Sequence, residues 1–199
     1  MALTKSGKVT LYAIASTASN TIDEGSAVDV STYYHATGRV LMGRGTGTAF
    51  TTGPTIIIQG SAVTSGSVAA NDWINLAEHQ MAVGASIGSQ AVSGTEAAGQ
   101  TTITLAAGTN FAAGDYVFIH NSTIGNSEWR YVQSVSGADI VVNEAIVNAA
   151  TGGTVRDQAE TFPFDLNLVG INALRLVVNG AGSGQAVVVM ADFGGVSAL

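Results

Sequence analysis

The stretch Thr55-Ile-Ile-Ile-Gln-Gly60 decides the fold of this 199-residue chain. It is nearly continuous in β-branched side chains, which favour strands, and its lack of polar alternation indicates a central strand. A central strand needs a partner on each side. The rest of the chain supplies short β-forming runs separated by Gly, Asn and Ser, which is the pattern of an all-β protein.

The strands that flank this run are expected to build a β-sandwich. Residues 8–14 (KVTLYAI) alternate polar and apolar side chains, as a half-buried strand does. Residues 172–178 and 185–193 are expected to close the chain as a hairpin, since the connector at 179–184 is rich in turn residues. The predicted sandwich strands are residues 8–14, 25–30, 38–42, 55–60, 72–76, 172–178 and 185–193.

The segment between the two groups of sandwich strands has a different sequence pattern. Five short strands joined by tight turns lie within about sixty residues, which suggests a small β-barrel. We therefore expect an all-β fold, a jelly-roll-like β-sandwich (residues 1–93 plus 159–199) with an inserted small β-barrel module (residues 94–158). A tandem arrangement is the alternative, but the strands after Phe162 would then lack partners. The predicted module strands are residues 101–105, 116–119, 128–135, 140–142 and 154–156, with a single helical turn at 144–150.

Charge is scarce in this chain. Only 11% of the residues are charged, against about 25% in ordinary domains, and the net charge is −7. Such a surface suits a protein that packs against neighbours in an ordered assembly. Seven Lys and Arg without a cluster exclude nucleic-acid binding and a basic membrane helix, because both need grouped cations. The longest apolar runs are too short to cross a bilayer.

Cysteine is absent, which excludes disulfides and thiolate metal sites. The first eight residues lack the apolar segment of a secretory signal, so we expect synthesis in a cytoplasm.

No catalytic or metal-binding pattern emerges from the polar residues. The three histidines, His35, His79 and His120, lack the spacing of a local zinc site, and we expect them to be ordinary surface or interface residues. The glycine-rich loop at 43–48 lacks the lysine and the following helix of a phosphate-binding loop, and no GxSxG elbow occurs. The sequence therefore predicts no enzyme and no cofactor.

Two further groups of residues could be either functional sites or ordinary polar turns and loops. Asp23, Glu24 and Asp29 could coordinate Ca²⁺, but the alternation of an EF-hand is absent and a solvated turn is the favoured interpretation. Asn121 begins a glycosylation sequon, which without a secretory signal is only a polar loop.

The residues proposed for partner binding are Lys5, Lys8, Trp73 and Trp129. Exposed tryptophans would anchor an interface, whereas burial in the core is the favoured alternative. Residues 1–8 are a candidate arm whose two lysines would meet an acidic partner surface, with a frayed terminus as the equal alternative. If they form an arm, their deletion weakens partner binding without unfolding the protein.

The pattern as a whole resembles structural proteins of tailed bacteriophages. Residues 55–61, 72–76, 174–180 and 186–191 are similar to the sandwich of such proteins, and residues 102–105, 111–117 and 132–137 to their small barrel modules. The role that the resemblance implies is a head decoration (cement) protein. Proteins of that kind sit on the capsid exterior, often as trimers, and bridge major capsid subunits.

This resemblance leaves more than one role open. The expected partners are a major capsid protein and further copies of the chain, with a trimer favoured, and the expected location is the capsid exterior of a virion. The alternative is a tail, fibre or baseplate component that binds host surface glycans. A glycan hydrolase would need two carboxylates about 5 to 9.5 Å apart, to which nothing in the sequence points.

Overall fold

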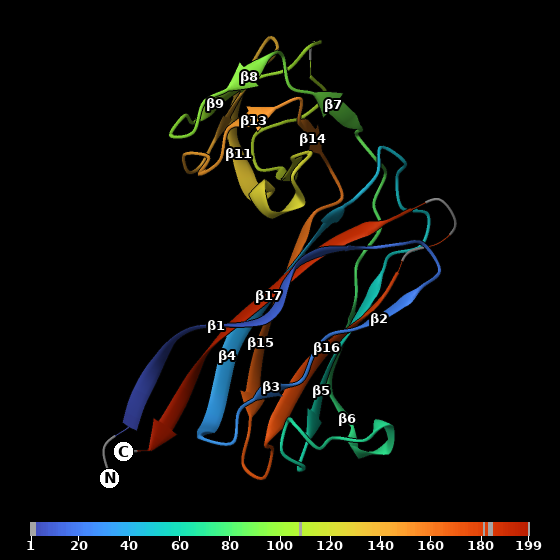
Figure 1. The fold of residues 1–199 in the computed structure, drawn as a ribbon. Coiled ribbons are helices and arrows are strands. Elements are labelled where there is room, and N and C mark those ends of the chain that lie inside the picture. The colour runs from blue at the N-terminus through green and yellow to red at the C-terminus, as the bar shows by residue number, and fades with distance from the viewer. Residues whose placement is uncertain (1–2, 108, 181, 183–184, 199) are drawn as a thin grey trace.

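The computed structural model of the protein describes residues 3–198, apart from Gly108, Ala181, Ser183 and Gly184. Its regular structure is almost entirely β-strand, with short 3-10 turns at Ala70–Asp72 (η1) and Ile124–Asn126 (η2). Figure 1 shows an elongated molecule with a sandwich at one end and a smaller module at the other. The prediction of an all-β sandwich with a barrel-like module is confirmed.

The first sheet of the sandwich has four long antiparallel strands. Its order is β1–β17–β4–β15, so the two ends of the chain pair with each other (Figure 1). The strands β17 and β4 pair without interruption from Val187↔Arg44 to Val196↔His35. The strands are β1 (Leu3–Thr17), β4 (Tyr33–Arg44), β15 (Glu160–Asn167) and β17 (Val187–Ala198).

The second sheet contains the run that decided the fold. Its order is β2–β16–β5–β6, with β3 also paired to β16, so β5 has a neighbour on each side as predicted. In β5, Ile56 and Ile58 are fully buried while Ile57 is half-buried, so the strand faces the core on one side only. The strands are β2 (Ile22–Glu24), β3 (Val28–Asp29), β5 (Thr55–Ser61), β6 (Ile74–Gln80) and β16 (Ala173–Asn179).

The two sheets pack face to face around one apolar core. Alternate residues of β4, β5, β16 and β17 point into it, because side chains alternate between the faces of a strand. Among them are Met42, Ile58, Leu176 and Val189, each fully buried.

The module forms a six-stranded antiparallel sheet that curls back on itself. Its order is β7–β14–β10–β11–β12–β9, and a bridge between Val92 and Leu105 joins the chain next to its two edge strands. A core of buried apolar residues, from Val92 to Val155 among those described, lies inside. The strands are β7 (Ser89–Ala91), β9 (Thr102–Thr104), β10 (Tyr116–His120), β11 (Glu128–Ser136), β12 (Asp139–Val142) and β14 (Thr154–Arg156), with β8 (Thr95–Glu96) and β13 (Ala150–Thr151) as a separate pair.

A third, smaller cluster joins the module to the sandwich. Phe118 and Trp129 of the module pack with Leu41 and Val188, which lie on the outer face of the first sheet. Their contact is close because β4 has a glycine there: a Cβ atom on Gly43 would lie 2.5 Å from Cγ of Phe118. The boundaries predicted at residues 94 and 158 stay a prediction.

Several local expectations are wrong. The predicted hairpin of residues 172–178 and 185–193 does not form, because β16 and β17 belong to different sheets. No helical turn is present at 144–150. Trp73 follows η1 and precedes β6 instead of lying within a strand.

The N-terminal arm is also absent from the described part of the chain. Residues from Leu3 onward pair with β17, beginning at Leu3↔Ala198 and including Lys5↔Val196 and Lys8↔Gly194. The predicted arm is therefore part of an edge strand, and its deletion is expected to remove backbone hydrogen bonds of the sheet. Residues 1 and 2 lie outside the described residues.

Candidate functional site

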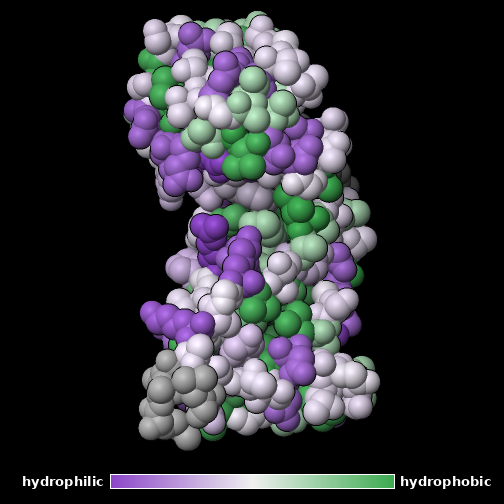
Figure 2. All heavy atoms as spheres, turned by 60° about the vertical axis from the view of Figure 1, so that its left-hand side comes forward, coloured by the Kyte–Doolittle hydropathy of each residue, from purple (hydrophilic) through white to green (hydrophobic). Residues whose placement is uncertain are grey.

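A groove of about 560 Å³ lies between the module and the outer face of the first sheet. Figure 2 shows the surface hollowed between the two parts of the molecule. Concave surfaces between two packed units are a common place for binding sites. The sheet contributes Lys8, Ile14, Arg39, Leu41 and Met190, and the module contributes residues of β10, β11 and the loops at 125–127 and 143–148.

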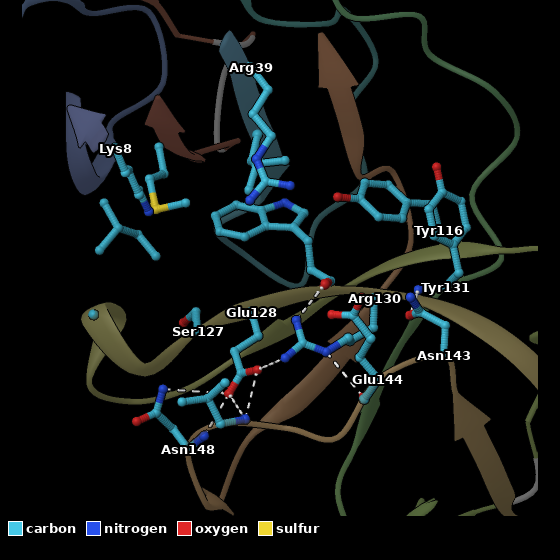
Figure 3. Close-up of a pocket in the computed structure, with 16 residues that line it drawn as sticks. Lys8, Arg39, Tyr116, Ser127, Glu128, Arg130, Tyr131, Asn143, Glu144 and Asn148 are labelled. Atoms are coloured by element: carbon cyan, nitrogen blue, oxygen red, sulfur yellow. Dashed lines mark hydrogen bonds and ion pairs between the residues drawn. The ribbon is translucent and has the colours of Figure 1, made fainter. Parts of the chain in front are cut away.

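The sheet side of the groove carries two cations that share one carboxylate. Lys8 Nζ lies 3.0 Å from Asp192 Oδ2, and Arg39 Nε lies 3.6 Å from Asp192 Oδ1. Both cationic side chains are more than half exposed, whereas Asp192 is mostly covered. Figure 3 shows Lys8 and Arg39 on one side of the groove, opposite Glu128, Arg130 and Asn148. This side therefore has an excess of positive charge available to a partner.

The module side is organised by Glu128, which is 7% exposed. Its carboxylate pairs with Arg130 and accepts hydrogen bonds from the backbone N–H groups of Val147 (2.9 Å) and Asn148 (2.7 Å). Arg130 in turn donates to the carbonyl oxygens of residues 144 and 145 at 3.2 and 3.0 Å. Because both carboxylate oxygens are occupied, Glu128 acts as a brace for the loop at 144–148.

Two tyrosines lie at one end of the groove. The rings of Tyr116 and Tyr131 are 4.5 Å apart between centroids and tilted by 38°. The Tyr116 hydroxyl accepts a hydrogen bond from Thr161 Oγ1 at 2.8 Å, and burial raises the pKa of Tyr116. Tyr131 remains half exposed and offers an aromatic surface with a polar tip.

The four residues predicted to bind a partner occupy three different environments. Lys5 and Lys8 are exposed on β1. Trp73 is half-buried on the other sheet, with the Arg175 guanidinium carbon 4.4 Å from its ring centroid. Trp129 is 7% exposed beneath the groove. Its burial favours the core interpretation, and partner binding by Trp129 stays a prediction that its position does not support.

The other polar groups considered from the sequence serve local structure. His35 pairs with Asp165, and His79 Nε2 lies 2.6 Å from Glu160 Oε1. The Asn121 side chain donates to the carbonyl oxygen of Ala149 at 2.8 Å. His120 is separate from both, and burial, with the charge of Arg156 as a smaller cause, lowers its pKa to about 4.

The predicted acidic group is likewise engaged in separate contacts. The hydroxyl of Tyr12 donates to Asp23, Glu24 pairs with Arg175 at 2.7 Å, and Asp29 accepts from the backbone N–H of Ser31 at 2.9 Å. Among the residues that the structure describes, no three His, Cys, Asp or Glu side chains are placed to hold a metal ion. The same residues include no helix long and apolar enough to span a membrane.

The sequence pointed to Lys8 but missed Arg39, Tyr131 and the brace at Glu128. A signal exists for the brace alone. Glu128 and Arg130 are two apart on one strand and therefore share a face, so an ion pair could have been expected. The approach of β4 to β11 involves residues far apart in sequence, and no local pattern indicates it.

Comparisons with known proteins give distant likenesses only. No family model and no curated protein matches the chain. Among solved structures it is similar to the tailspike protein gp49 from Pseudomonas phage LKA1, with 25% identity, a TM-score of 0.31 and coverage of 37% of this chain and 15% of that one. It is also similar to the Pseudomonas phage phi297 tailspike gp61, with 22% identity, a TM-score of 0.31 and coverage of 34% and 14%.

A third similar structure is aligned over nearly its whole length. It is the SPBc2 prophage-derived protein YomS, with 10% identity, a TM-score of 0.31 and coverage of 98% of this chain and 96% of that one. The chain thus spans about a seventh of the two tailspikes and nearly all of YomS. All three come from phages or a prophage, but at these TM-scores the likeness carries no argument about this chain.

Proposed function

We propose that this protein is a structural component of a bacteriophage virion that decorates the capsid exterior and bridges major capsid subunits. The observation that carries the proposal is the position of exposed apolar side chains at two separate places on an elongated molecule, the end of the sandwich far from the module and the rim of the groove. Large apolar groups exposed together mark interaction sites more often than scattered ones do. A bridging protein needs two such sites that are separated in space.

The first site is at the end of the sandwich far from the module. It comprises Tyr34, Ile74 and Val169, which are 50%, 56% and 70% exposed. The loop of Val169 reaches Tyr34 through a hydrogen bond from the Leu168 N–H to the Tyr34 carbonyl oxygen (2.9 Å). Ile74 pairs with Gly60 at the same end of the second sheet. Figure 1 shows this end of the sandwich opposite the module.

The second site is on the module, at the rim of the groove. It comprises Tyr131 and Val147, which are 50% and 72% exposed. The hydrogen bond from the Val147 N–H to Glu128 holds this loop in place. The exposed side chain of Val147 can therefore bind a partner with little loss of conformational entropy in the loop. The two sites together would let one copy touch two neighbours in a shell.

The scarcity of charge supports the same role. A shell is stabilised by many modest contacts repeated by symmetry, and a weakly charged surface loses little solvation in each of them. The remainder of the proposal follows from the resemblance: partners are the major capsid protein and further copies of the chain, with a trimer favoured. No enzymatic activity and no cofactor belong to this role.

The first test is the stoichiometry of the chain in particles of its own phage. A native lysate is sedimented through a sucrose gradient, and the chain and the major shell protein are quantified by mass spectrometry. Near-equal copy numbers in the particle fraction support decoration. A few copies per particle would place the chain in a tail, and its absence from particles would overturn the virion role.

The second test locates the binding sites on shells that lack the protein. We expect Val169→Asp and Val147→Asp each to lower occupancy, because a carboxylate at either site must be desolvated on contact. Ile22→Asp is the matched control, since Ile22 is 67% exposed but belongs to neither site. Occupancy that falls equally in all three variants, or in none, would contradict bridging through the two sites.

A second candidate function is favoured by the half-exposed ring of Tyr131 beside the polar groups of the groove. Such an arrangement suits a tail, fibre or baseplate component that stacks a host glycan on an aromatic ring. Trp129 lines the same groove, so its fluorescence is expected to change when a ligand binds there. The variant Trp73→Phe removes the other tryptophan, so that the signal comes from Trp129. A change in fluorescence with polysaccharides of the host surface, lost in Tyr131→Ala, would support this function, and a flat response would count against it.

A further inference from the structure

The cations that reach solvent are confined to one part of the molecule. All seven Lys and Arg lie among the described residues. Arg44 and Arg156 are buried, and the side chains of Arg130 and Arg175 are 12% exposed and paired with carboxylates. Only the three others are exposed, and these are Lys5, Lys8 and Arg39.

Strand register places these three cations on a single face. Each pairs with an even-numbered residue of β17, as Lys5↔Val196, Lys8↔Gly194 and Arg39↔Asp192. The odd-numbered residues of β17, such as Val189 and Ala191, point into the sandwich core. Because paired residues of an antiparallel ladder point the same way, all three cations lie on the outer face of the first sheet. We call Lys5, Lys8 and Arg39 the basic face.

The basic face is only partly neutralised. Lys8 and Arg39 share the single carboxylate of Asp192. Asp165, on the same face of β15, pairs with His35. Lys5 has no ion pair with any described residue. An acidic partner would therefore find unsatisfied positive charge there.

The module has the opposite charge at its surface. Its two arginines are covered, so the charged groups that it presents to solvent are carboxylates. Two of these, each partly exposed, gather at β9, the edge strand of the module sheet. Glu96 accepts a hydrogen bond from the Thr104 N–H at 2.8 Å, and Asp139 pairs with Thr104 in the ladder. Figure 1 shows β8 and β9 at the end of the module far from the sandwich. We call Glu96 and Asp139 the acidic end.

We propose that the acidic end of one copy binds the basic face of a second copy. The two surfaces are at different places on the same chain, and the acidic end points away from its own sandwich, so the contact has to be made between copies. A contact between two different surfaces is heterologous, and it closes into a ring when the rotation permits. This inference concerns self-association and does not depend on the proposed capsid role.

The contact is expected to depend on salt. Exposed ion pairs are individually weak and are screened by added ions, so the association should weaken as ionic strength rises. Charge complementarity of this kind also selects the partner surface and orients the encounter.

Sedimentation velocity of the full chain tests the proposal at about 50 mM and about 500 mM salt, where screening lengths differ several-fold. We expect wild-type protein to self-associate at low salt and to dissociate at high salt. Lys5→Glu with Lys8→Glu, and separately Glu96→Lys with Asp139→Lys, should each weaken association by about ten-fold or more. Glu78→Lys is the matched control, because this exposed carboxylate lies on β6, outside both surfaces.

The combined variant, with both reversals in one chain, decides the result. Since it exchanges the signs of the two surfaces, it should recover association to near the wild-type level, which a folding defect cannot do. Far-UV circular dichroism and melting temperature confirm that each variant is folded. A wild-type monomer at every concentration, an unchanged constant in the single reversals, or no recovery in the combined variant would overturn the proposal.

Discussion

Trp129 Nε1 donates a hydrogen bond to the carbonyl oxygen of Met42 at 2.8 Å, and this bond joins the module to the sandwich. The two residues are 87 positions apart in sequence. The ring of Trp129 also packs on Phe118, with centroids 4.8 Å apart. One indole therefore provides both an apolar contact and a directed polar contact across the junction, and it fixes how the two parts meet.

Replacing this indole by a phenyl ring tests the polar half of the contact. We expect Trp129→Phe to lower the free energy of unfolding by about 1 to 3 kcal/mol, because the Met42 carbonyl loses its donor in a buried place. Chemical denaturation followed by circular dichroism measures the change. Trp73→Phe is the control, and an equal loss in the two variants would show that the hydrogen bond is not the cause.

The close approach of β4 to the module predicts an intolerance at Gly43. A Cβ atom there would lie 2.5 to 2.9 Å from Phe118 side-chain atoms, so we expect Gly43→Ala to cost about 1 to 3 kcal/mol of stability. Gly47→Ala is the matched control, since a Cβ atom at Gly47 meets nothing within 4 Å. Thermal unfolding compares the two. If both variants have the melting temperature of the wild type, β4 and Phe118 are not in close contact.

The buried ion pair at the junction predicts a large effect of neutralising Asp157. Arg44 Nη1 lies 3.0 Å from Asp157 Oδ1, and both side chains are almost fully buried. Asp157→Asn would leave Arg44 charged without its partner, and losses of about 3 to 5 kcal/mol are typical of such changes. Burial already lowers the pKa of Arg44.

An exposed pair serves as the comparison for Asp157→Asn. Asp165→Asn breaks the contact with His35, where the Asp165 side chain is 71% exposed, and we expect almost no change in stability. Urea denaturation of both variants measures the difference. A small loss for Asp157→Asn would mean that Arg44 finds water or another acceptor when its partner is removed.

His120 predicts a loss of stability in mild acid. Its folded pKa of about 4 lies below the ordinary value of 6.5, because burial disfavours the charged imidazole and Arg156 repels it. Unfolded chains therefore take up the proton first as the pH falls. The contribution of His120 to the free energy of unfolding is constant well above pH 6.5 and decreases between about pH 6.5 and 4. The loss is well below the roughly 3 kcal/mol that the full shift would give, because His120 is only partly buried and solvent screens its charge.

The source of this pH dependence is tested by His120→Gln, which removes the titrating group. We expect the variant to show a shallower fall in unfolding free energy over the same pH range, measured by denaturation at a series of pH values. His35→Gln is the control, because His35 is partly exposed next to Asp165. A slope that is unchanged in His120→Gln would assign the acid sensitivity to another group.

Local patterns were enough for most individual strands. The module strands predicted at residues 116–119, 128–135, 140–142 and 154–156 lie within or nearly coincide with β10, β11, β12 and β14. Tight turns join or follow these strands. The period-two pattern and the turn residues, which are close together in the sequence, are therefore enough to predict them. Alternation along the chain decides which residues share a face of a strand, and that rule needs no tertiary contact.

Pairing over long distances was beyond the reach of local patterns. The hairpin expected from β16 and β17 fails because β17 pairs with β4 and β1, whereas β16 pairs with β5. A turn-rich connector permits a hairpin but equally permits a crossing from one sheet to the other. The candidate arm at Lys5 and Lys8, rated equal to a frayed terminus, is not formed for a related reason, since the partner strand of this segment is at the opposite end of the chain.

By itself the sequence determined that this is a weakly charged, all-β protein with a sandwich and a barrel-like module, because side-chain alternation and composition are properties of short segments. The tertiary structure was needed to place Lys5, Lys8 and Arg39 on one face, to bury Trp129 under the groove, and to separate the exposed apolar side chains into one group at the far end of the sandwich and another at the rim of the groove. These features depend on strand register and on the docking of two cores. Both are set by the free energy of packing residues that are far apart in the chain, which no local pattern records.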